Sequence, residues 1–275
     1  MITKHYKTID SFNQKQESIR ILIEIQKVCL KLRLHFYLAY GTLLGAIRHK
    51  GFIPWDDDVD IWMPRKDYEV FIKEFNNHCT PEFKLKSWHT DIDYPIIVAK
   101  VVSKRTYIEE KCFKPIEGMG IWVDIFPLDT VTKSNIKAIQ EEVKLEHRRW
   151  MSLYHQSTLC SKIKLFFYNL IQKDTKFSDI NLKPSYFMNL IYALSYSIED
   201  SDKLVSPSSA VEFSKYFDAE DFKSTIDADF EGHKFPIPVG YDNILKTLYG
   251  NYMKLPPIAK QKMDKHLKKA IWLDK

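Results

Sequence analysis

Hydrophobic and polar positions along the first half of the chain predict helices and strands in turn. Apolar residues recur at helical spacing over residues 18–32, and an aromatic run over residues 36–40 is typical of a strand. Helical spacing resumes over residues 42–47. Gly41 and Thr42 therefore occupy a predicted turn between a strand and a helix.

A second strand is predicted over residues 58–63, where apolar and acidic side chains alternate. Such alternation would send Asp58 and Asp60 to one face of the strand and would turn Asp57 away from them. The other elements predicted in this half are one helix and two strands, over residues 66–76, 96–102 and 120–126. Elements in this order predict an α/β or α+β domain built on a sheet.

The pattern changes after about residue 133, where helical periods replace the strands. Helices are predicted over residues 134–154, 163–172, 186–199, 241–249 and 258–272. Proline residues separate several of these segments. We therefore predict a sheet-containing core over residues 1–133 and a mainly helical region over residues 134–275 that packs on it.

Composition limits the class of protein. The chain has 275 residues, a net charge of +5, and 45% hydrophobic residues, enough for a sizeable buried core. This mild charge suits an acidic ligand such as a nucleotide, but it does not indicate nucleic-acid binding, and no basic block with interleaved aromatic residues occurs. The first residues lack the apolar core of a secretion signal, and the 4 cysteines are far apart in sequence. Both features favour a cytoplasmic location.

The most informative segment is a run of carboxylates, Asp56, Asp57, Asp58 and Asp60. Two carboxylates on one face of a strand repel each other unless a cation lies between them, and hard oxygen ligands suit Mg²⁺ or Mn²⁺. The neighbours Val59 and Ile61 place the acids in a buried strand rather than in a solvated turn. We therefore predict that Asp58 and Asp60 bind a divalent metal, with Asp56 as a loop residue or an outer ligand.

Asp124 is predicted to be the third carboxylate of the same site. It lies between Val123 and Ile125 in a predicted strand, where a charge is unfavourable unless it has a role. It would bind a second metal or act as a general base toward an attacking hydroxyl. Asp129, which follows Pro127 closely, is interpreted as a turn or helix-entry residue.

Basic and glycine residues near the acids are candidates for phosphate binding. Gly41 at a turn would let the backbone approach a phosphate, and the following helix N-terminus would offer free N–H groups beside the Thr42 hydroxyl. Arg48 and Lys100 carry the positive charge that a phosphate would contact.

Calcium binding is an alternative interpretation of the acids. Asp56, Asp58 and Asp60 match the first ligand positions of an EF-hand loop. However, Ile61 replaces the glycine of the sixth position and Asp67 replaces the glutamate of the twelfth. A solvated acidic turn is the other alternative.

The segment over residues 40–60, which reads Tyr-Gly-Thr-Leu-Leu-Gly-Ala-Ile-Arg-His-Lys-Gly-Phe-Ile-Pro-Trp-Asp-Asp-Asp-Val-Asp, closely resembles the signature of the LicD family. That family belongs to the nucleotidyltransferase-fold superfamily, which has a Gly-Ser/Thr pair, then an Asp-x-Asp and then a third acid. The matching positions are Gly41-Thr42, Asp58, Asp60 and Asp124. Residues 120–129 and 249–257 resemble two further blocks of the family. The resemblance implies an α+β fold with a nucleotidyltransferase-like mixed sheet and flanking helices.

The resemblance also implies an activity. LicD-type proteins are bacterial phosphocholine transferases acting on cell-surface glycans, and they resemble fukutin-type ribitol-phosphate transferases. The implied reaction moves phosphocholine from CDP-choline to a sugar hydroxyl of a glycan or its lipid-linked precursor, with Mg²⁺ held by Asp58, Asp60 and Asp124. The second half of the chain would complete the donor or acceptor site. CDP-ribitol and CDP-glycerol donors, and true nucleotidyl transfer, remain alternatives.

A choline donor and a lipid-linked acceptor would each need further contacts. Aromatic rings bind a quaternary ammonium by cation–π attraction. Candidates for this contact are Trp62, Trp122, Trp150 and Tyr154. A lipid-linked acceptor would allow peripheral contact with the inner face of the cytoplasmic membrane.

Overall fold

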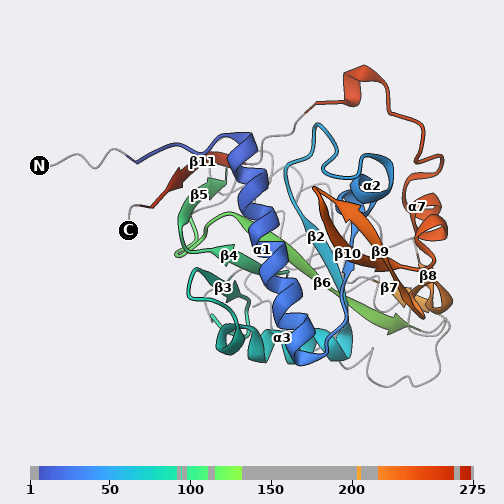
Figure 1. Cartoon of the computed structure of the whole chain (residues 1–275), viewed down its shortest axis with the longest axis horizontal. Coiled ribbons are helices and arrows are strands. Elements are labelled where there is room, and N and C mark those ends of the chain that lie inside the picture. The colour runs from blue at the N-terminus through green and yellow to red at the C-terminus, as the bar shows by residue number, and fades with distance from the viewer. Residues whose placement is uncertain are drawn as a thin grey trace, which may run out of the picture.

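The computed structural model describes residues 6–91, 94, 98–110, 115–131, 203–205, 216–262 and 267–273. A mixed β-sheet lies at its centre (Figure 1). The strands of this sheet are β1 (Tyr37–Leu38), β2 (Asp60–Pro64), β3 (Phe83–Lys86), β4 (Ala99–Ser103), β6 (Trp122–Val131), β7 (Lys203–Val205) and β8 (Phe217–Asp218). Their order is β1-β2-β6-β4-β3, with β7 paired to β6 and β8 paired to β7. Only the β2–β6 pair is parallel among these described strands.

Two helices cover one face of the sheet. Helix α1 (Ser11–Leu32) lies against β4 and β6, and α3 (Arg65–His78) lies against β2, β3 and β6. Asp10 caps α1, because its side chain accepts a hydrogen bond of 2.8 Å from the backbone N–H of Asn13. This cap starts α1 earlier than the predicted residue 18.

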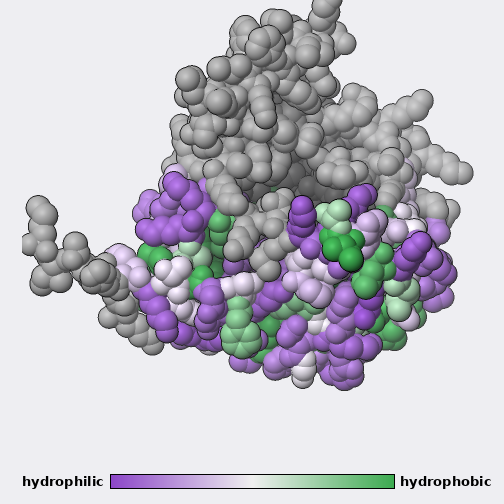
Figure 2. All heavy atoms as spheres, turned by 90° about the horizontal axis from the view of Figure 1, so that it is seen from above, coloured by the Kyte–Doolittle hydropathy of each residue, from purple (hydrophilic) through white to green (hydrophobic). Residues whose placement is uncertain are grey.

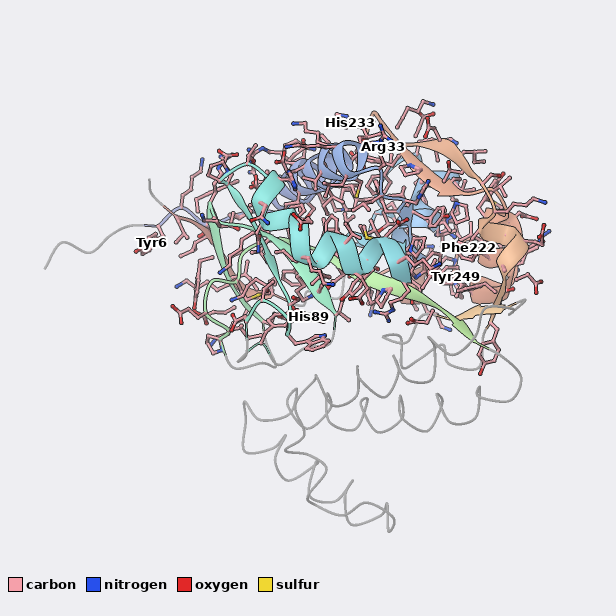
Figure 3. The ribbon with its side chains drawn as sticks, turned by 90° about the horizontal axis from the view of Figure 1, so that it is seen from below. Tyr6, Arg33, His89, Phe222, His233 and Tyr249 are labelled. Atoms are coloured by element: carbon pink, nitrogen blue, oxygen red, sulfur yellow. The ribbon has the colours of Figure 1, made fainter. Side chains whose placement is uncertain are left out.

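A second group of elements packs around β1 and β2. Helix α2 (Tyr40–Arg48) contacts β2, the strand β9 (Thr225–Phe230) and the helix α7 (Tyr241–Tyr249). Strand β10 (His233–Pro238) forms a hairpin with β9 and contacts β1. The short 3₁₀ helix η3 (Ala219–Phe222) places Phe222 against Tyr37, with ring centres 5.5 Å apart. Figure 3 shows Phe222 and Tyr249 at the same end of the molecule.

The two ends of the described chain lie side by side. Strand β11 (Leu267–Trp272) pairs with β5 (Thr106–Glu110) in a two-stranded sheet. Thr8 forms an isolated bridge with Ile271, which brings the first described residues onto the same ribbon (Figure 1).

The predicted α+β fold with a mixed sheet and flanking helices is confirmed. The helix predicted over residues 241–249 matches α7. The helix predicted over residues 258–272 is wrong, because a short 3₁₀ helix, η4 (Ile258–Lys260), is followed by β11, whose backbone pairs with β5. The helices predicted over residues 134–154, 163–172 and 186–199 lie outside the described residues. A mainly helical second half and a boundary at residue 133 therefore stay predictions.

The surface seen from above is largely hydrophilic where the structure describes it, with hydrophobic side chains in small groups (Figure 2). Within the described ranges, no helix combines the length and the apolar character needed to cross a bilayer.

Candidate active site

Two carboxylates stand at the same level on neighbouring parallel strands. Asp60 begins β2, Asp124 lies in β6, and the register pairs these two residues. Paired residues of adjacent strands project to the same side of a sheet, and the strands are only about 4.8 Å apart. The sheet therefore holds both carboxylates together on one face, as their mutual charge effect also indicates.

Asp56 and Asp58 approach this pair from the connection between α2 and β2. Burial raises the pKa of Asp60 well above its ordinary value, and the charges of Asp58, Asp124 and Asp56 raise it further. Burial also raises the pKa of Asp56. Since β2 begins at Asp60, Asp58 precedes the strand, and its predicted place on the strand is wrong. The Asp58 and Asp60 side chains nevertheless lie close enough for the charge of one to raise the pKa of the other.

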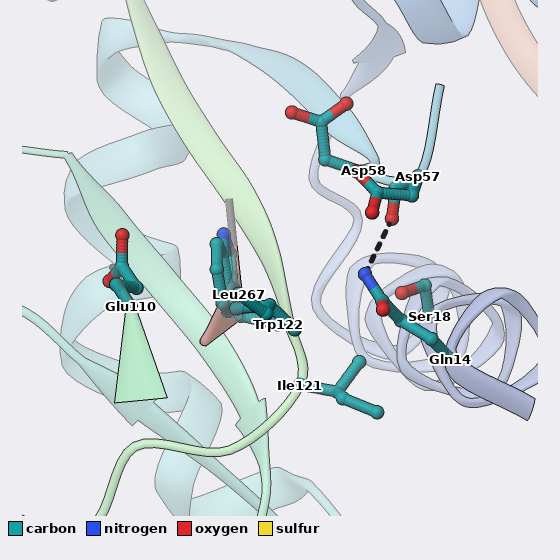
Figure 4. Close-up of a pocket in the computed structure, with 8 residues that line it drawn as sticks. All are labelled: Gln14, Ser18, Asp57, Asp58, Glu110, Ile121, Trp122 and Leu267. Atoms are coloured by element: carbon teal, nitrogen blue, oxygen red, sulfur yellow. Dashed lines mark hydrogen bonds between the residues drawn. The ribbon is translucent and has the colours of Figure 1, made fainter. Parts of the chain in front are cut away.

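Asp57 is not among the carboxylates whose charges raise the pKa of Asp60, and its predicted orientation away from the site stays a prediction. It is buried, and it lines a pocket together with Asp58 and Trp122 (Figure 4). Its carbonyl oxygen accepts a hydrogen bond of 3.2 Å from Nε2 of Gln14 in α1. Alternation holds only within a strand, and Asp57 precedes β2. The pocket has a volume of about 150 Å³, which is below the roughly 300–1,000 Å³ of usual ligand pockets.

Asp124 is held by two donors from neighbouring positions of the sheet. Lys100 of β4 faces it in register and places Nζ 2.5 Å from Oδ1. Trp122 donates from Nε1 to Oδ2 at 2.7 Å. The Lys100 ammonium also lies 4.2 Å from the centre of the Trp122 ring. Lys100 therefore contacts Asp124, and it lies against one face of an aromatic ring that was a candidate for choline. Its predicted role in phosphate binding stays a prediction.

The charges of the site fit a divalent cation. Asp56, Asp58, Asp60 and Asp124 influence one another in a buried place, and a cation would relieve that repulsion. In the described ranges, however, no three His, Cys, Asp or Glu side chains are already arranged to hold a metal ion together. Lys100 and Trp122 each contact one oxygen of Asp124. Metal binding by Asp58, Asp60 and Asp124 stays a prediction.

The first turn of α2 positions the acids. A Cβ atom on Gly41 would lie 2.5 Å from Oδ2 of Asp56, so a larger residue at this position would require the Asp56 carboxylate to shift. Thr42 accepts a hydrogen bond of 2.9 Å from the backbone N–H of Asp60 through Oγ1. Tyr40, which begins the helix, has a φ of 41°, a strained value for a residue with a side chain. Gly41 thus lies inside α2 rather than in a turn before it, and phosphate binding by Gly41 and Thr42 stays a prediction.

Arg48 lies at the opposite end of α2. Its guanidinium donates to the carbonyl oxygen of Tyr252 at 2.6 Å and to Nε2 of His49 at 2.8 Å. Burial lowers the pKa of Arg48. These contacts tie Arg48 to the segment that follows α7 rather than to the carboxylates, and its role toward phosphate stays a prediction.

An ion pair near the site was not foreseen. Asp129 was expected in a turn or at a helix entry, but it is buried in β6 and accepts hydrogen bonds of 2.6 and 2.5 Å from Arg65. Arg65 begins α3 directly after β2. The pair therefore locks the end of β2 to β6. Two features of the sequence could have indicated this pair: Asp129 follows Asp124 by five positions, and Arg65 follows Asp60 by five positions.

Glu231 also escaped the sequence analysis. It lies at the tip of the β9–β10 hairpin and accepts a hydrogen bond of 2.9 Å from the backbone N–H of Phe52. Its own N–H donates to the carbonyl oxygen of Lys50 at 3.0 Å. A Cβ atom on Gly51 would overlap the Glu231 carboxylate. The hairpin thus fixes the connection that leads from α2 to the acids, and no local pattern in the sequence signals this.

The structure also decides two alternatives. Trp62 is fully buried and packs against Tyr40 and Phe217, which makes it a core residue rather than a ligand for choline. Trp150 and Tyr154 lie outside the described residues. An EF-hand loop over residues 56–67 is wrong, because strand β2 and the start of α3 occupy most of that range.

Comparison with known proteins shows what these residues are similar to. Residues 33–159 match the profile described as LicD/FKTN/FKRP, nucleotidyltransferase domain. This part of the chain is therefore similar to LicD-type nucleotidyltransferase domains. The matched range includes α2, β2 and β6, and with them Asp60 and Asp124.

One relative extends the similarity over most of the chain, and two others match short stretches of it. The lipopolysaccharide cholinephosphotransferase LicD of Haemophilus influenzae is 29% identical over 265 residues, which cover 90% of this chain and 93% of that protein. An uncharacterized protein of Caenorhabditis elegans is 36% identical over 74 residues, 27% of this chain and 20% of that protein. An uncharacterized protein of Rickettsia typhi is 34% identical over 65 residues, 24% of this chain and 19% of that protein.

Proposed function

We propose that this protein is a phosphotransferase that moves phosphocholine from CDP-choline to a sugar hydroxyl of a lipopolysaccharide or of its lipid-linked precursor. The similarity to a lipopolysaccharide cholinephosphotransferase over 90% of the chain supports the reaction class and the choline group. The observation that carries the proposal is the pairing of Asp60 with Asp124 on parallel strands, with Asp58 and Asp56 beside them.

In the proposed reaction the sugar hydroxyl oxygen attacks the phosphorus that bears choline. The bond from this phosphorus to the bridging oxygen of the pyrophosphate breaks, CMP leaves with the bonding electrons, and the hydroxyl proton passes to a carboxylate. Mg²⁺ between Asp58 and Asp60 would neutralise charge on the pyrophosphate. Asp124 is the candidate for proton acceptor, and Lys100 beside it supplies a buried positive charge toward the leaving group.

Removal of single carboxylate charges tests this proposal. We expect Asp60→Asn and Asp124→Asn to lower CMP release from CDP-choline by roughly 10²- to 10⁴-fold, because positioned acid–base and charged groups contribute on this scale. The matched control is Asp227→Asn, which changes an exposed carboxylate on β9 and should leave turnover unchanged. Full activity in both site variants, with native circular dichroism, would reject the proposal.

The donor and the product distinguish the related activities. Release of CMP from CDP-ribitol or CDP-glycerol, but not from CDP-choline, would assign a polyol-phosphate transferase. Transfer of a labelled nucleoside to the acceptor would assign nucleotidyl transfer instead.

Cation dependence is tested separately on the same assay. Treatment with a chelator should abolish turnover, and added Mg²⁺ or Mn²⁺ should restore it, since four neighbouring carboxylates otherwise repel the pyrophosphate. Turnover that persists in excess chelator would contradict a metal requirement.

A further inference from the structure

The segment after α7, residues 249–262, exposes large apolar side chains. Met253 is 57% exposed, Leu255 is 50% exposed and Ile258 is 85% exposed. Large apolar side chains that gather on one short surface segment indicate a site of interaction, whereas single ones are ordinary. The segment lies at the upper edge of the molecule in Figure 1, beyond α7.

Lysines are interspersed among these apolar side chains. Lys254, Lys260 and Lys262 are exposed, and residues 243–262 contain no aspartate or glutamate. No ion pair of these three lysines occurs within the described part of the chain, whereas Lys246 on α7 has Asp242 at 2.6 Å. The segment is therefore both apolar and positively charged.

The base of the segment is fixed to the rest of the fold. The Tyr252 carbonyl oxygen accepts from Arg48, and the Tyr252 hydroxyl donates to Asp242 at 2.6 Å. Gln261 donates from Nε2 to the carbonyl oxygen of Pro256 at 2.7 Å. These contacts hold the backbone so that Met253 and Ile258 face solvent instead of folding onto the core.

We propose that residues 249–262 dock onto a bilayer containing anionic lipid. Apolar side chains enter the boundary between head groups and acyl chains, while the lysine ammonium groups remain at the level of the anionic head groups. Lysine is depleted from the centres of protein–protein interfaces, and here lysine separates the apolar residues from one another. The mixture therefore fits a lipid surface better than a protein surface.

Such docking would orient the candidate active site, a point that rests on the proposed function. The connection between α2 and β2, which carries the acids, reaches the same upper edge in Figure 1 as residues 249–262. A sugar acceptor anchored in the bilayer would then meet the site from that side. Lipid binding itself is measured without turnover, so it succeeds or fails independently of the chemistry.

Sedimentation with vesicles tests the proposal. The purified full chain should bind vesicles of phosphatidylcholine and phosphatidylglycerol, lose that binding at high salt, and bind pure phosphatidylcholine far more weakly. A Lys254→Glu/Lys260→Glu/Lys262→Glu variant should partition roughly 100-fold less, because each lysine near an anionic surface contributes about 1 kcal/mol. A Met253→Ser/Ile258→Ser variant should partition at least about tenfold less.

Two matched variants control for general effects. Lys31→Glu/Lys66→Glu/Lys84→Glu makes the same change in net charge at exposed positions elsewhere, and Phe12→Ser/Leu30→Ser removes exposed apolar side chains from α1. Both should bind as the unchanged chain does. The proposal is overturned if the unchanged chain does not sediment with phosphatidylglycerol vesicles, or if the controls lose as much binding. Self-association that Ile258→Ser abolishes, without vesicle binding, would assign the surface to a second copy instead.

Discussion

Gly41 leaves space for the carboxylate of Asp56 because glycine has no side chain. Oδ2 of Asp56 occupies the space where a Cβ atom would lie. Gly41→Ala should therefore lower the free energy of unfolding by roughly 1–3 kcal/mol, the range for overpacked sites. In the Asp56→Ala background the same substitution should be nearly neutral, because the overlap is gone. Urea denaturation of the four proteins measures this coupling, and strictly additive effects would contradict it.

Removing one partner of the buried pair of Arg65 and Asp129 should destabilise the fold strongly. Asp129→Ala leaves the Arg65 guanidinium buried without its bidentate partner, so we expect a loss of roughly 3–5 kcal/mol in unfolding free energy. Asp229→Ala removes an exposed pair with Lys234 and should leave the stability unchanged within error. Equal losses in the two variants, measured by urea denaturation, would refute the distinction between the pairs.

The sequence indicated the strands that carry the candidate acids, but it did not indicate how these strands pair. Asp60 and Asp124 were both expected on strands, and the structure places them so. Their register could not be predicted, because it depends on how two distant strands pair. The predicted strand began at Asp58, two residues too early, so the alternation of β2 does not decide the orientation of Asp57. Asp129 was misplaced because its partner Arg65 is distant in the chain, and local patterns do not report such contacts.

The β9–β10 hairpin contacts α2 and the connection that leads from α2 to the acids. Its tip residue Glu231 accepts the Phe52 N–H, which is near the start of the acidic run. Glu231→Ala should lower the free energy of unfolding by about 1–3 kcal/mol, because it leaves a partly buried donor without its partner. Glu231→Gln keeps an acceptor oxygen and should lose clearly less. Faster amide hydrogen exchange at Phe52 in the alanine variant would locate the effect, and unchanged exchange there would contradict it.

Strand β11 shows why an element can be misjudged from its own residues. Apolar residues over 258–272 fit a helical period, yet Leu267–Trp272 forms a strand. The edge of β5 offers backbone partners there, and pairing with that edge buries Ala270 and Ile271. Helix α7 was predicted correctly because its apolar face and its final glycine, Gly250, are both local features.

The predicted division at residue 133 can be tested by comparing a fragment with the full chain. Residues 1–133 contain all the candidate carboxylates and phosphate-binding residues, but β1, α2, β5 and β6 each contact an element from later in the chain. A fragment of residues 1–133 would expose those apolar contacts to water. We therefore expect it to show no cooperative urea transition, whereas the full chain does. A cooperative transition in the fragment would contradict this and support an independent core.

The parallel pairing of β2 with β6 has a consequence for how the protein matures. These strands are separated by α3, β3, β4 and β5 along the chain, so their contact closes a long loop, and contacts of that kind form slowly. During synthesis Asp60 leaves the ribosome well before Asp124, and Glu231 follows later still. We therefore expect the carboxylates to stay hydrated and apart until late in folding. In refolding experiments, catalytic competence should return with the slowest native signal rather than with early helix formation.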